Sequence, residues 1–299
     1  MICGLPQSVS IRRSALGMKS PATKSLLAGI ALLCSFGPVQ TKADIFTVCG
    51  VDLGLAGRTK TWAALALGSG NVTDVTDFSA QSSLVGDVGA VRGDVKFSGG
   101  SSIHGDVYLH TTGHYKNSST GEHPGAIHQD PFTNMLLDQA KLDAMNASMA
   151  AFNKPNMGPP GLTSLTNFRS SHGGNWNISG YGCVVLHLGN FMMTGGTFTL
   201  TGTATDAIII NLTGTLTLTG NTTFVLSGGL TWDSILFNIV GSGGDVQISG
   251  QAFMQGIILA TQRRVVVNGS RGVFGEVIAN RVRLTGSGRI VNPSVQSQF

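Results

Sequence analysis

Short segments that alternate apolar and polar residues run through the second half of the chain, and each ends in a polar residue followed by glycine. Thr197–Gly202 reads TFTLTG, and Thr215–Gly220 reads TLTLTG. Similar blocks follow at nearly the same spacing in Val246–Gly250, Val265–Gly269 and Val282–Gly286. Alternation with a period of two predicts strands with one side turned inward. A repeat of about 18 residues is too short for a domain, so it predicts one coil of a solenoid in which equivalent strands stack.

A different pattern occupies residues 130–152. Asp130 is a typical N-cap, and Pro131 suits the first position of a helix. Apolar residues then recur at helical spacing, which predicts one amphipathic helix over 130–152 with its apolar stripe buried against a side of the solenoid. The expected stripe consists of Phe132, Met135, Leu136, Leu142, Met145, Met149 and Phe152.

Strands are predicted on both sides of this helix. Residues 44–128 contain three Gly-Asp-Val triplets, which mark turns that lead into strands. After the helix, Ala207–Leu212 (AIIINL) and Ser234–Val240 (SILFNIV) are almost continuously apolar, as expected for strands that are buried on both sides. We therefore expect residues 44–299 to form a single all-β domain, a parallel β-solenoid or β-helix that includes the helix.

The first 43 residues have the pattern of a signal peptide. Leu26–Phe36 is apolar but too short to span a bilayer, and small residues flank Lys42, as cleavage after Ala43 requires. Met18 is the better candidate for the start of translation. We expect a secreted (extracellular or periplasmic) protein without a membrane span in its mature chain, residues 44–299. An uncleaved membrane anchor is the alternative.

The positive charge of the chain belongs mostly to this leader. The sequence has 19 Lys and Arg against 15 Asp and Glu, and five of the basic residues precede Asp44. The mature chain therefore has 14 basic and 15 acidic residues, so nucleic acid is not an expected partner. Two cysteines, Cys49 and Cys183, remain after cleavage, and an exported protein can join them in a disulfide. Two buried thiols are the alternative.

Several segments carry a family resemblance. They are TWAALALGSG (Thr61–Gly70), LSGGLTWDSILFNIVGSGGDVQISG (Leu226–Gly250), MQGIILA (Met254–Ala260) and VFGEVIANRVRL (Val273–Leu284). With one long helix between two strand-rich regions, the chain resembles the bacterial ice-binding solenoids over almost all of residues 51–291. It is equally similar to the related exported adhesin-type solenoids called choice-of-anchor A or collagen-binding-like. The resemblance implies an irregular right-handed β-solenoid with the helix packed along its side.

Rows of threonine are the first candidate site. Threonines at alternate positions of stacked strands form a lattice of hydroxyl and methyl groups, which can order water or dock a flat repetitive surface. The alternative is that threonine is simply a good strand former on a solvent-exposed face. The candidate residues are Thr197, Thr199, Thr201, Thr215, Thr217 and Thr219.

Arginines in the last coils are the second candidate site. A local basic patch there would meet an acidic polysaccharide or another anionic surface. The alternative is a solvated end coil whose charges prevent end-to-end stacking. The candidate residues are Arg263, Arg264, Arg281 and Arg283.

Metal and catalytic chemistry are not predicted. Histidines are frequent between residues 104 and 128, but their spacing matches no compact metal motif: His104, His110, His114, His123 and His128. The acidic residues of the array over 176–290 are not paired in the way that glycosidases or lyases require, and no nucleophile motif is present. We therefore expect no metal, no cofactor and no enzyme activity.

Binding to an extended surface is the function that these patterns favour. The threonine ladder is incomplete, because VVV and VRLT replace T-x-T in the late blocks. We therefore expect a non-enzymatic, adhesin-like or extracellular-matrix module, with ice binding as the alternative. The partner would be ice, a polysaccharide or a matrix protein.

Overall fold

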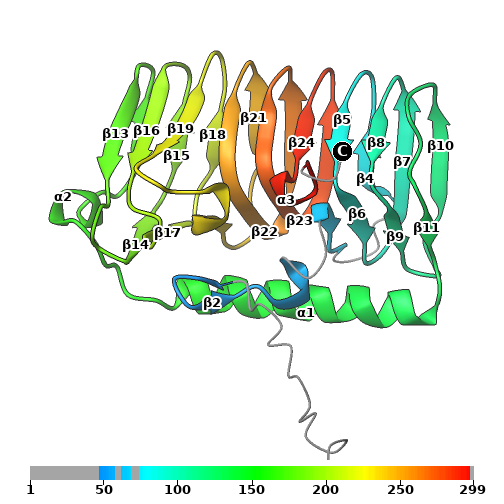
Figure 1. The fold of residues 1–299 in the computed structure, drawn as a ribbon, viewed down its shortest axis with the longest axis horizontal. Coiled ribbons are helices and arrows are strands. Elements are labelled where there is room, and N and C mark those ends of the chain that lie inside the picture. Colours follow the sequence, from blue (N-terminus) through cyan, green and yellow to red (C-terminus); the bar gives the residue numbers. More distant parts are fainter. Residues whose placement is uncertain (1–46, 58–61, 69–73, 297–299) are drawn as a thin grey trace, which may run out of the picture. The chain divides into compact units, whose positions relative to one another are not determined.

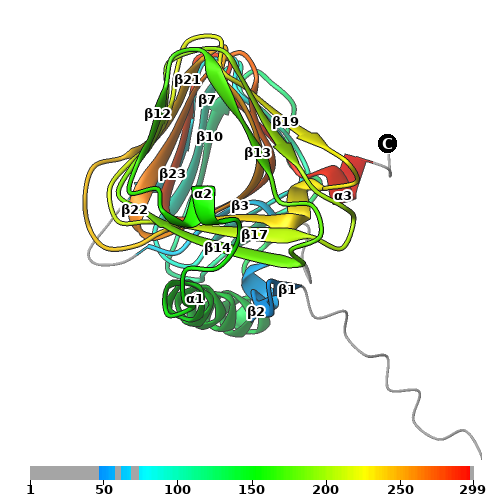
Figure 2. The ribbon, with the colours of Figure 1, turned by 90° about the vertical axis from the view of Figure 1, so that its left-hand side faces the viewer.

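A computed structural model describes residues 47–57, 62–68 and 74–296. They belong to one compact unit, Ala43–Phe299. The strands of this unit wind into a solenoid of triangular cross-section, and α1 (Pro131–Phe152) lies along one of its sides (Figure 2). The predicted fold class, an all-β parallel solenoid with one long helix, is therefore confirmed. The expected signal peptide, residues 1–43, lies outside the described residues.

Each full coil contributes one strand to each of three sides, which we call faces A, B and C. Face A contains β3 (Trp62–Ala66), β6 (Asp87–Ala90), β9 (Val107–Leu109), β11 (Ile127–His128), β14 (Cys183–Leu188), β17 (Ala207–Leu212) and β20 (Ile235–Ile239). Face B contains β4 (Asp74–Phe78), β7 (Asp94–Gly99), β10 (Tyr115–Ser119), β12 (Phe168–Ser170), β15 (Phe191–Met193), β18 (Leu216–Leu218) and β21 (Val246–Gly250). Face C contains β5 (Ser83–Val85), β8 (Ser102–His104), β13 (Gly173–Asn177), β16 (Thr197–Thr201), β19 (Thr223–Ser227) and β24 (Arg289–Val291). Two long strands pass through all three faces: β22 (Phe253–Gly269) and β23 (Gly272–Thr285).

The order of the coils in space differs from their order in the sequence. β23, from the end of the chain, pairs in parallel with β3, from its beginning, through Val277↔Ala64 and Ile278↔Leu65. The N-terminal coils therefore stack onto the C-terminal coils and form one continuous solenoid (Figure 1). α1 returns the chain from β11 at one end to β12 at the other, and its 22 residues span about 33 Å.

The length of one coil varies along the chain. The step from Val246 to Val265 is one coil, because these two residues are in register. The step from Thr197 to Thr215 is not, because Thr197 is in register with Thr223 and the coil is longer there. The two threonine blocks look alike because any strand with one buried side alternates in this way. They are strands of different faces, so the prediction that they stack is wrong.

Glycine follows Thr219 at the end of β18 for a steric reason. Gly220 has a φ of 63°, in the left-handed region that other residues rarely adopt. A Cβ atom at this position would also clash with the carbonyl oxygen of Thr194 on the neighbouring coil. The corner between faces B and C therefore requires glycine here, which explains the Thr-Gly ending of this block.

The ends of α1 match the prediction, but its buried side does not. The Oδ1 atom of Asp130 accepts a hydrogen bond from the backbone N–H of Thr133 at 2.8 Å, and Pro131 is the first helical residue. The side against the solenoid consists mainly of small residues: Thr133, Leu137, Ala140, Ala144, Ala147, Ser148 and Ala151. Six of the seven residues expected in the buried stripe are exposed instead: Phe132, Met135, Leu142, Met145, Met149 and Phe152.

Close packing explains this choice of residues. The side of face A that points out of the solenoid is itself apolar and carries Leu65, Val185, Ile209, Leu236 and Ile257, all in one buried cluster with the alanines of α1. Alanine lets the helix backbone approach this sheet closely, and large side chains at these positions would hold the helix away. Face A is therefore apolar on both sides, which explains why Ala207–Leu212 is almost continuously apolar.

A buried amide ladder fixes the end of α1 on face A. Asn211 and Asn238 are in register on β17 and β20, and the Nδ2 atom of Asn238 lies 2.7 Å from the Oδ1 atom of Asn211. Asn238 also donates to the carbonyl of Ser148, and Asn211 donates to the carbonyl of Ala151, both at 2.9 Å. Buried polar groups need such partners, so these bonds permit only one position of the helix along the sheet.

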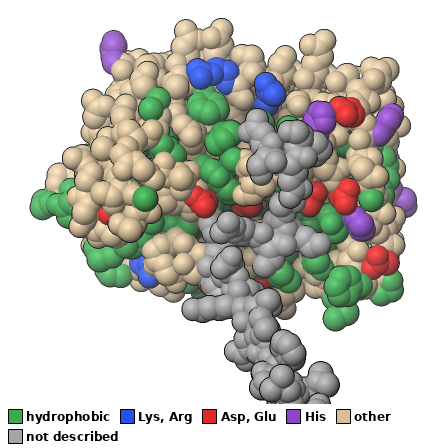
Figure 3. Space-filling model, viewed as in Figure 1, with side chains coloured by type: hydrophobic (Ala, Val, Ile, Leu, Met, Phe, Trp, Pro, Cys, Tyr) green, Lys and Arg blue, Asp and Glu red, His purple; other side chains and the backbone are tan. Residues whose placement is uncertain are grey.

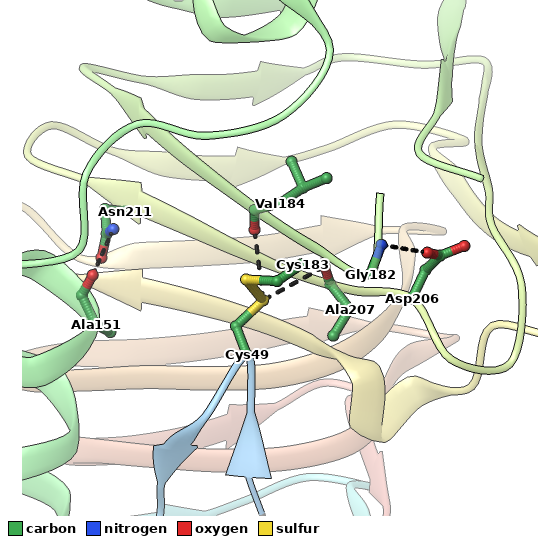
Figure 4. The surroundings of a disulfide bond; sticks show 8 residues. All are labelled: Cys49, Ala151, Gly182, Cys183, Val184, Asp206, Ala207 and Asn211. Atoms are coloured by element: carbon green, nitrogen blue, oxygen red, sulfur yellow. Dashed lines mark hydrogen bonds between the residues drawn. A yellow bond between two sulfur atoms is a disulfide. The ribbon is translucent and has the colours of Figure 1, made fainter. Parts of the chain in front are cut away.

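The first described residues complete the cover of face A. β1 (Thr47–Val48), β2 (Val51–Asp52) and η1 (Gly54–Ala56) pack beside α1. Cys49 forms a disulfide with Cys183 of β14, with 5.2 Å between the Cα atoms (Figure 4). The two cysteines considered in the sequence are therefore joined, which ties the start of the described chain to the second half.

A buried carboxylate stabilises the corner next to this disulfide. Asp206 accepts hydrogen bonds from the backbone N–H groups of Thr203, Gly182 and Gly180. These bonds, above all the one from Thr203, lower the pKa of Asp206 to about 2. The acidic side chain is thus a structural group of this corner (Figure 4).

Short elements complete the fold. α2 (Pro160–Thr163) lies between α1 and β12, and Leu162 and Leu165 of this segment pack against the solenoid core. η2 (Trp232–Ser234) and α3 (Pro293–Gln296) lie at other bends. Within the described ranges, no helix combines the length and the apolarity that a membrane crossing requires.

Two substitutions test the orientation of α1. Ala144 is fully buried and Met135 is 70% exposed. Ala144→Leu should lower the free energy of unfolding by about 1–3 kcal/mol, because the added atoms have no space between helix and sheet. Met135→Asp should change it by no more than about 0.5 kcal/mol. Urea unfolding of both variants measures the difference. A larger loss for Met135→Asp would mean that the large apolar side faces the solenoid.

Candidate functional site

The six threonines predicted as one lattice lie on two faces. Three are on β16 of face C: Thr197, Thr199 and Thr201. Three are on or beside β18 of face B: Thr215, Thr217 and Thr219. The structure therefore divides the predicted site, and each set has to be considered with its own neighbours.

Face C holds the more regular set. β13, β16 and β19 are five-residue strands paired in parallel without a register shift, and β16 lies between the other two. The side chains that point outward from them are short and uncharged, and all are at least partly exposed. Figure 3 shows mostly polar, uncharged side chains over these strands at the upper left. We call this set the hydroxyl patch: Asn175, Asn177, Thr197, Thr199, Thr201, Thr223, Val225 and Ser227.

The patch rests on a stack of aromatic rings. Trp176, Phe198 and Phe224 alternate with the outward residues and point into the solenoid, where Phe198 and Phe224 are fully buried. The ring centroids of Phe198 and Phe224 are 4.7 Å apart, and those of Trp176 and Phe198 are 5.0 Å apart in an edge-to-face arrangement. Such packing holds the strands in a fixed geometry, so the outward side chains keep a constant spacing.

This spacing forms a two-dimensional lattice. Neighbouring strands lie about 4.8 Å apart, and alternate residues along one strand lie about 6.6 Å apart. The Oγ1 atom of Thr201 and the Oγ atom of Ser227 are 2.8 Å apart, so the row that contains them is hydrogen-bonded across coils. The arrangement can present methyl and hydroxyl groups at regular intervals to a flat partner.

An arginine limits the patch on the side of β22. Arg271 donates from Nη1 to the Oγ1 atom of Thr223 at 2.9 Å. Its guanidinium carbon lies 5.0 Å from the centroid of the Phe253 ring, which places a cation over an aromatic face. Beyond this residue the outward positions of face C include Phe253 and Phe274, and the lattice of short polar groups ends.

Part of this patch was detectable in the sequence but was missed. Thr223–Gly228 reads TFVLSG and repeats the pattern of TFTLTG in Thr197–Gly202 one true coil later. A valine and a serine in place of two threonines obscured the match. Asn175 and Asn177 had no such signal, because GGNWN does not resemble the threonine blocks.

Face B has a different character, because its outward positions carry charges. Arg264 binds Asp245 through Nε at 3.1 Å, and Arg283 lies 3.4 Å from Asp77. Arg281 is in register with Arg264, so two of the predicted arginines are neighbours on this face. Three of the four candidate arginines therefore share one surface, and two of these three are paired with aspartates.

The fourth candidate arginine is not on the surface. Arg263 is 3% exposed and lies at the corner between faces A and B. Its guanidinium group donates hydrogen bonds to four backbone carbonyl oxygens, those of Thr213, Gly214, Val240 and Gly241. It holds three coils together at this corner, so its assignment to the basic patch is wrong.

The histidines near the other end of the solenoid pair with carboxylates. His104 lies 3.2 Å from Glu122, His114 lies 3.0 Å from Asp94, and His128 lies 2.9 Å from Asp106. Asp94 and Asp106 also accept backbone N–H groups of the next coil. No group of three or more potential metal ligands occurs in the part of the chain that the structure describes.

Comparisons with known proteins agree with this fold. A crystal structure of an ice-binding protein from the Antarctic ascomycete Antarctomyces psychrotrophicus has a TM-score of 0.56 at 15% identity and covers 81% of this chain and 98% of its own. A glycosylated ice-binding protein from an Arctic yeast has a TM-score of 0.55 at 18% identity, and the match covers 81% of this chain and 94% of the yeast protein. A domain of an ice-binding protein from Shewanella frigidimarina has a TM-score of 0.51 at 16% identity, and the match covers 80% of this chain and 95% of that domain. At these identities the similarity establishes the fold. No curated protein matches the sequence.

The sequence itself also matches a family. The family described as an ice-binding-like adhesive domain matches residues 55–292, which include every strand from β3 to β24 and the whole of α1. This range contains the hydroxyl patch, face B and the helix that covers face A. The chain therefore belongs to the ice-binding-like adhesive domain family.

Proposed function

We propose that this chain binds ice through the hydroxyl patch of face C and acts without catalysis. The observation that carries the proposal is the in-register array on β13, β16 and β19, which is uncharged, regular and rigidly supported from below. This reverses the order of the two functions expected from the sequence, in which an adhesin-like role came first.

The chemistry of ice explains why such an array is suitable. Ice presents only a repeating lattice of water and no charge, so a partner has to match it by spacing and by short neutral groups. Hydroxyl and amide groups of Thr199, Thr201 and Asn175 can join ordered water, and the methyl groups of the threonines and Val225 exclude mobile water between them. A charged side chain would instead keep its own hydration shell.

Two further observations support the proposal. Solved proteins with this fold are described as ice-binding proteins, from an Antarctic ascomycete and an Arctic yeast among others. The Cys49–Cys183 disulfide suits an oxidising compartment, where a protein that meets ice outside the cell would be located. Secretion through the leader is part of this proposal.

Face B supports a second candidate function, attachment to an anionic polysaccharide. Lys96 and Lys116 are in register on β7 and β10, and Arg281 and Arg283 lie on the same face. Asp77 lies in register between Arg283 and Lys96, and Lys116 pairs with Asp94, so an anionic partner laid across this face would compete with these aspartates for the cations. This site is separate from the hydroxyl patch, and the two functions are compatible in one chain.

Tyrosine substitutions distinguish the two threonine sets. Thr199→Tyr should abolish inhibition of ice recrystallisation, because a large ring rises above the flat array. Thr217→Tyr is the matched control, since Thr217 is also a half-buried threonine in the middle of a strand but lies on face B. It should leave the activity unchanged. Thermal melts of both variants should resemble that of the wild type. Loss of activity on Thr217→Tyr alone would assign ice binding to face B.

Charge reversal tests the second candidate function. Arg281→Glu combined with Arg283→Glu should weaken retention on alginate beads, most clearly at low salt, because screening is weakest there. Arg289→Glu changes an exposed arginine of face C and serves as the control. Equal retention of all three proteins would show that face B does not bind the polyanion.

A further inference from the structure

The outer side of α1 is unusually apolar for a helix in contact with solvent. Six large apolar side chains are 38–73% exposed there: Phe132, Met135, Leu142, Met145, Met149 and Phe152. Apolar side chains are visible along the lower edge of the molecule, where α1 lies (Figure 3). Large exposed apolar side chains that gather on one element commonly mark a binding site.

One flank of this side forms the wall of a groove. The groove has a volume of about 670 Å³ and runs between α1 and the corner that joins faces A and B. From the helix, Met145, Met149 and Phe152 line it. From the opposite side it is lined by Leu67, Val240 and residues of the neighbouring corners. Volumes of this size are typical of sites for small organic ligands.

The two ends of the groove differ in chemistry. Phe152 and Met149 lie at the end near Val240, where no charged side chain lines the described part of the groove, and Thr261 and Gln262 of the next coil add polar groups. At the other end Lys141 and Arg92 line the groove, and the Nζ atom of Lys141 donates to the carbonyl oxygen of Gly68 at 3.1 Å. The stretch of α1 from Lys141 to Phe152 makes the groove about 16 Å long.

The charged end of the groove is positive. Burial lowers the pKa of Lys141, and the nearby charge of Arg92 lowers it further. The negative charge of Asp138, one turn earlier on α1, raises the pKa of Lys141 and opposes these two effects. No carboxylate is among the described residues that line the groove. Two cations, Arg92 and Lys141, therefore face the described part of the groove, and Asp138 is the carboxylate that interacts with Lys141 from outside the lining.

We propose that this groove binds a medium-chain fatty acid. The hydrocarbon chain would lie along Met145, Met149 and Phe152, and the carboxylate would lie between Lys141 and Arg92. Methionine suits this role because its flexible, polarisable side chain adapts to a mobile alkyl chain. A ligand with one anionic head and one linear tail matches the single charged end, the length of the groove and the apolar side chains that α1 contributes to it. The groove is separate from the hydroxyl patch, so this site does not depend on ice binding.

Calorimetric titration of residues 44–299 with laurate, at concentrations below the critical micelle concentration of laurate, tests the site. We expect saturable binding of one laurate per chain. Dodecyltrimethylammonium has the same chain length and a cationic head, and it should not bind, because Lys141 and Arg92 would repel it. Equal binding of the two amphiphiles, or no binding of laurate, would overturn the proposal.

Variants on the same helix locate the site. Met149→Glu should weaken laurate binding by about tenfold or more, because it places a charge against the alkyl chain. Met135→Glu changes another exposed methionine of α1 outside the groove and should bind laurate like the wild type. Both variants should melt like the wild type. Equal weakening by the two, or a dimer in sedimentation velocity that laurate does not dissociate, would show that the groove is not a fatty-acid site.

Discussion

The contact between the alanine side of α1 and face A is the interaction on which the rest of the structure depends. The helix has to return the chain along the whole solenoid, because the first and last coils of the sequence, β3 and β23, meet in its middle. The helix packs closely on face A as it does so, because the small side chains of Ala140, Ala144 and Ala147 let its backbone approach the sheet. Face A is covered by α1 together with β1, β2 and η1, and the amides of Asn211 and Asn238 fix the position of the helix.

Closure of face A leaves two faces with different electrostatic properties. Near β13, β16 and β19, face C carries short neutral groups above a stack of aromatic rings, and it is suited to a partner without charge. Face B carries rows of arginine, lysine and aspartate, and it is suited to a charged partner. The same packing also turns the large residues of α1 outward, so a third surface with an apolar groove arises from the requirement for a close helix–sheet contact.

The local structure could be predicted well from the sequence, but the spatial order of the coils could not. Alternation and the Asp130-Pro131 start predicted the strands and the limits of α1, because these depend on neighbouring residues. The coil length was misjudged at Thr197 and Thr215, because strands of different faces share one pattern. The buried side of α1 was misassigned, since hydrophobicity alone predicts that methionine rather than alanine is buried. Only the close approach of the helix to face A explains why the alanines are buried instead. No local signal could show that β23 pairs with β3.

Adsorption to ice through a neutral, rigidly built face is the proposed function of this solenoid. The most direct measurement is the partition of the purified, fluorescently labelled mature chain between a slowly growing ice hemisphere and the remaining liquid, with an equally labelled albumin as reference. We expect the chain to be incorporated into the ice while the albumin stays in the liquid. Exclusion of the chain from the ice to the same extent as the albumin would contradict it.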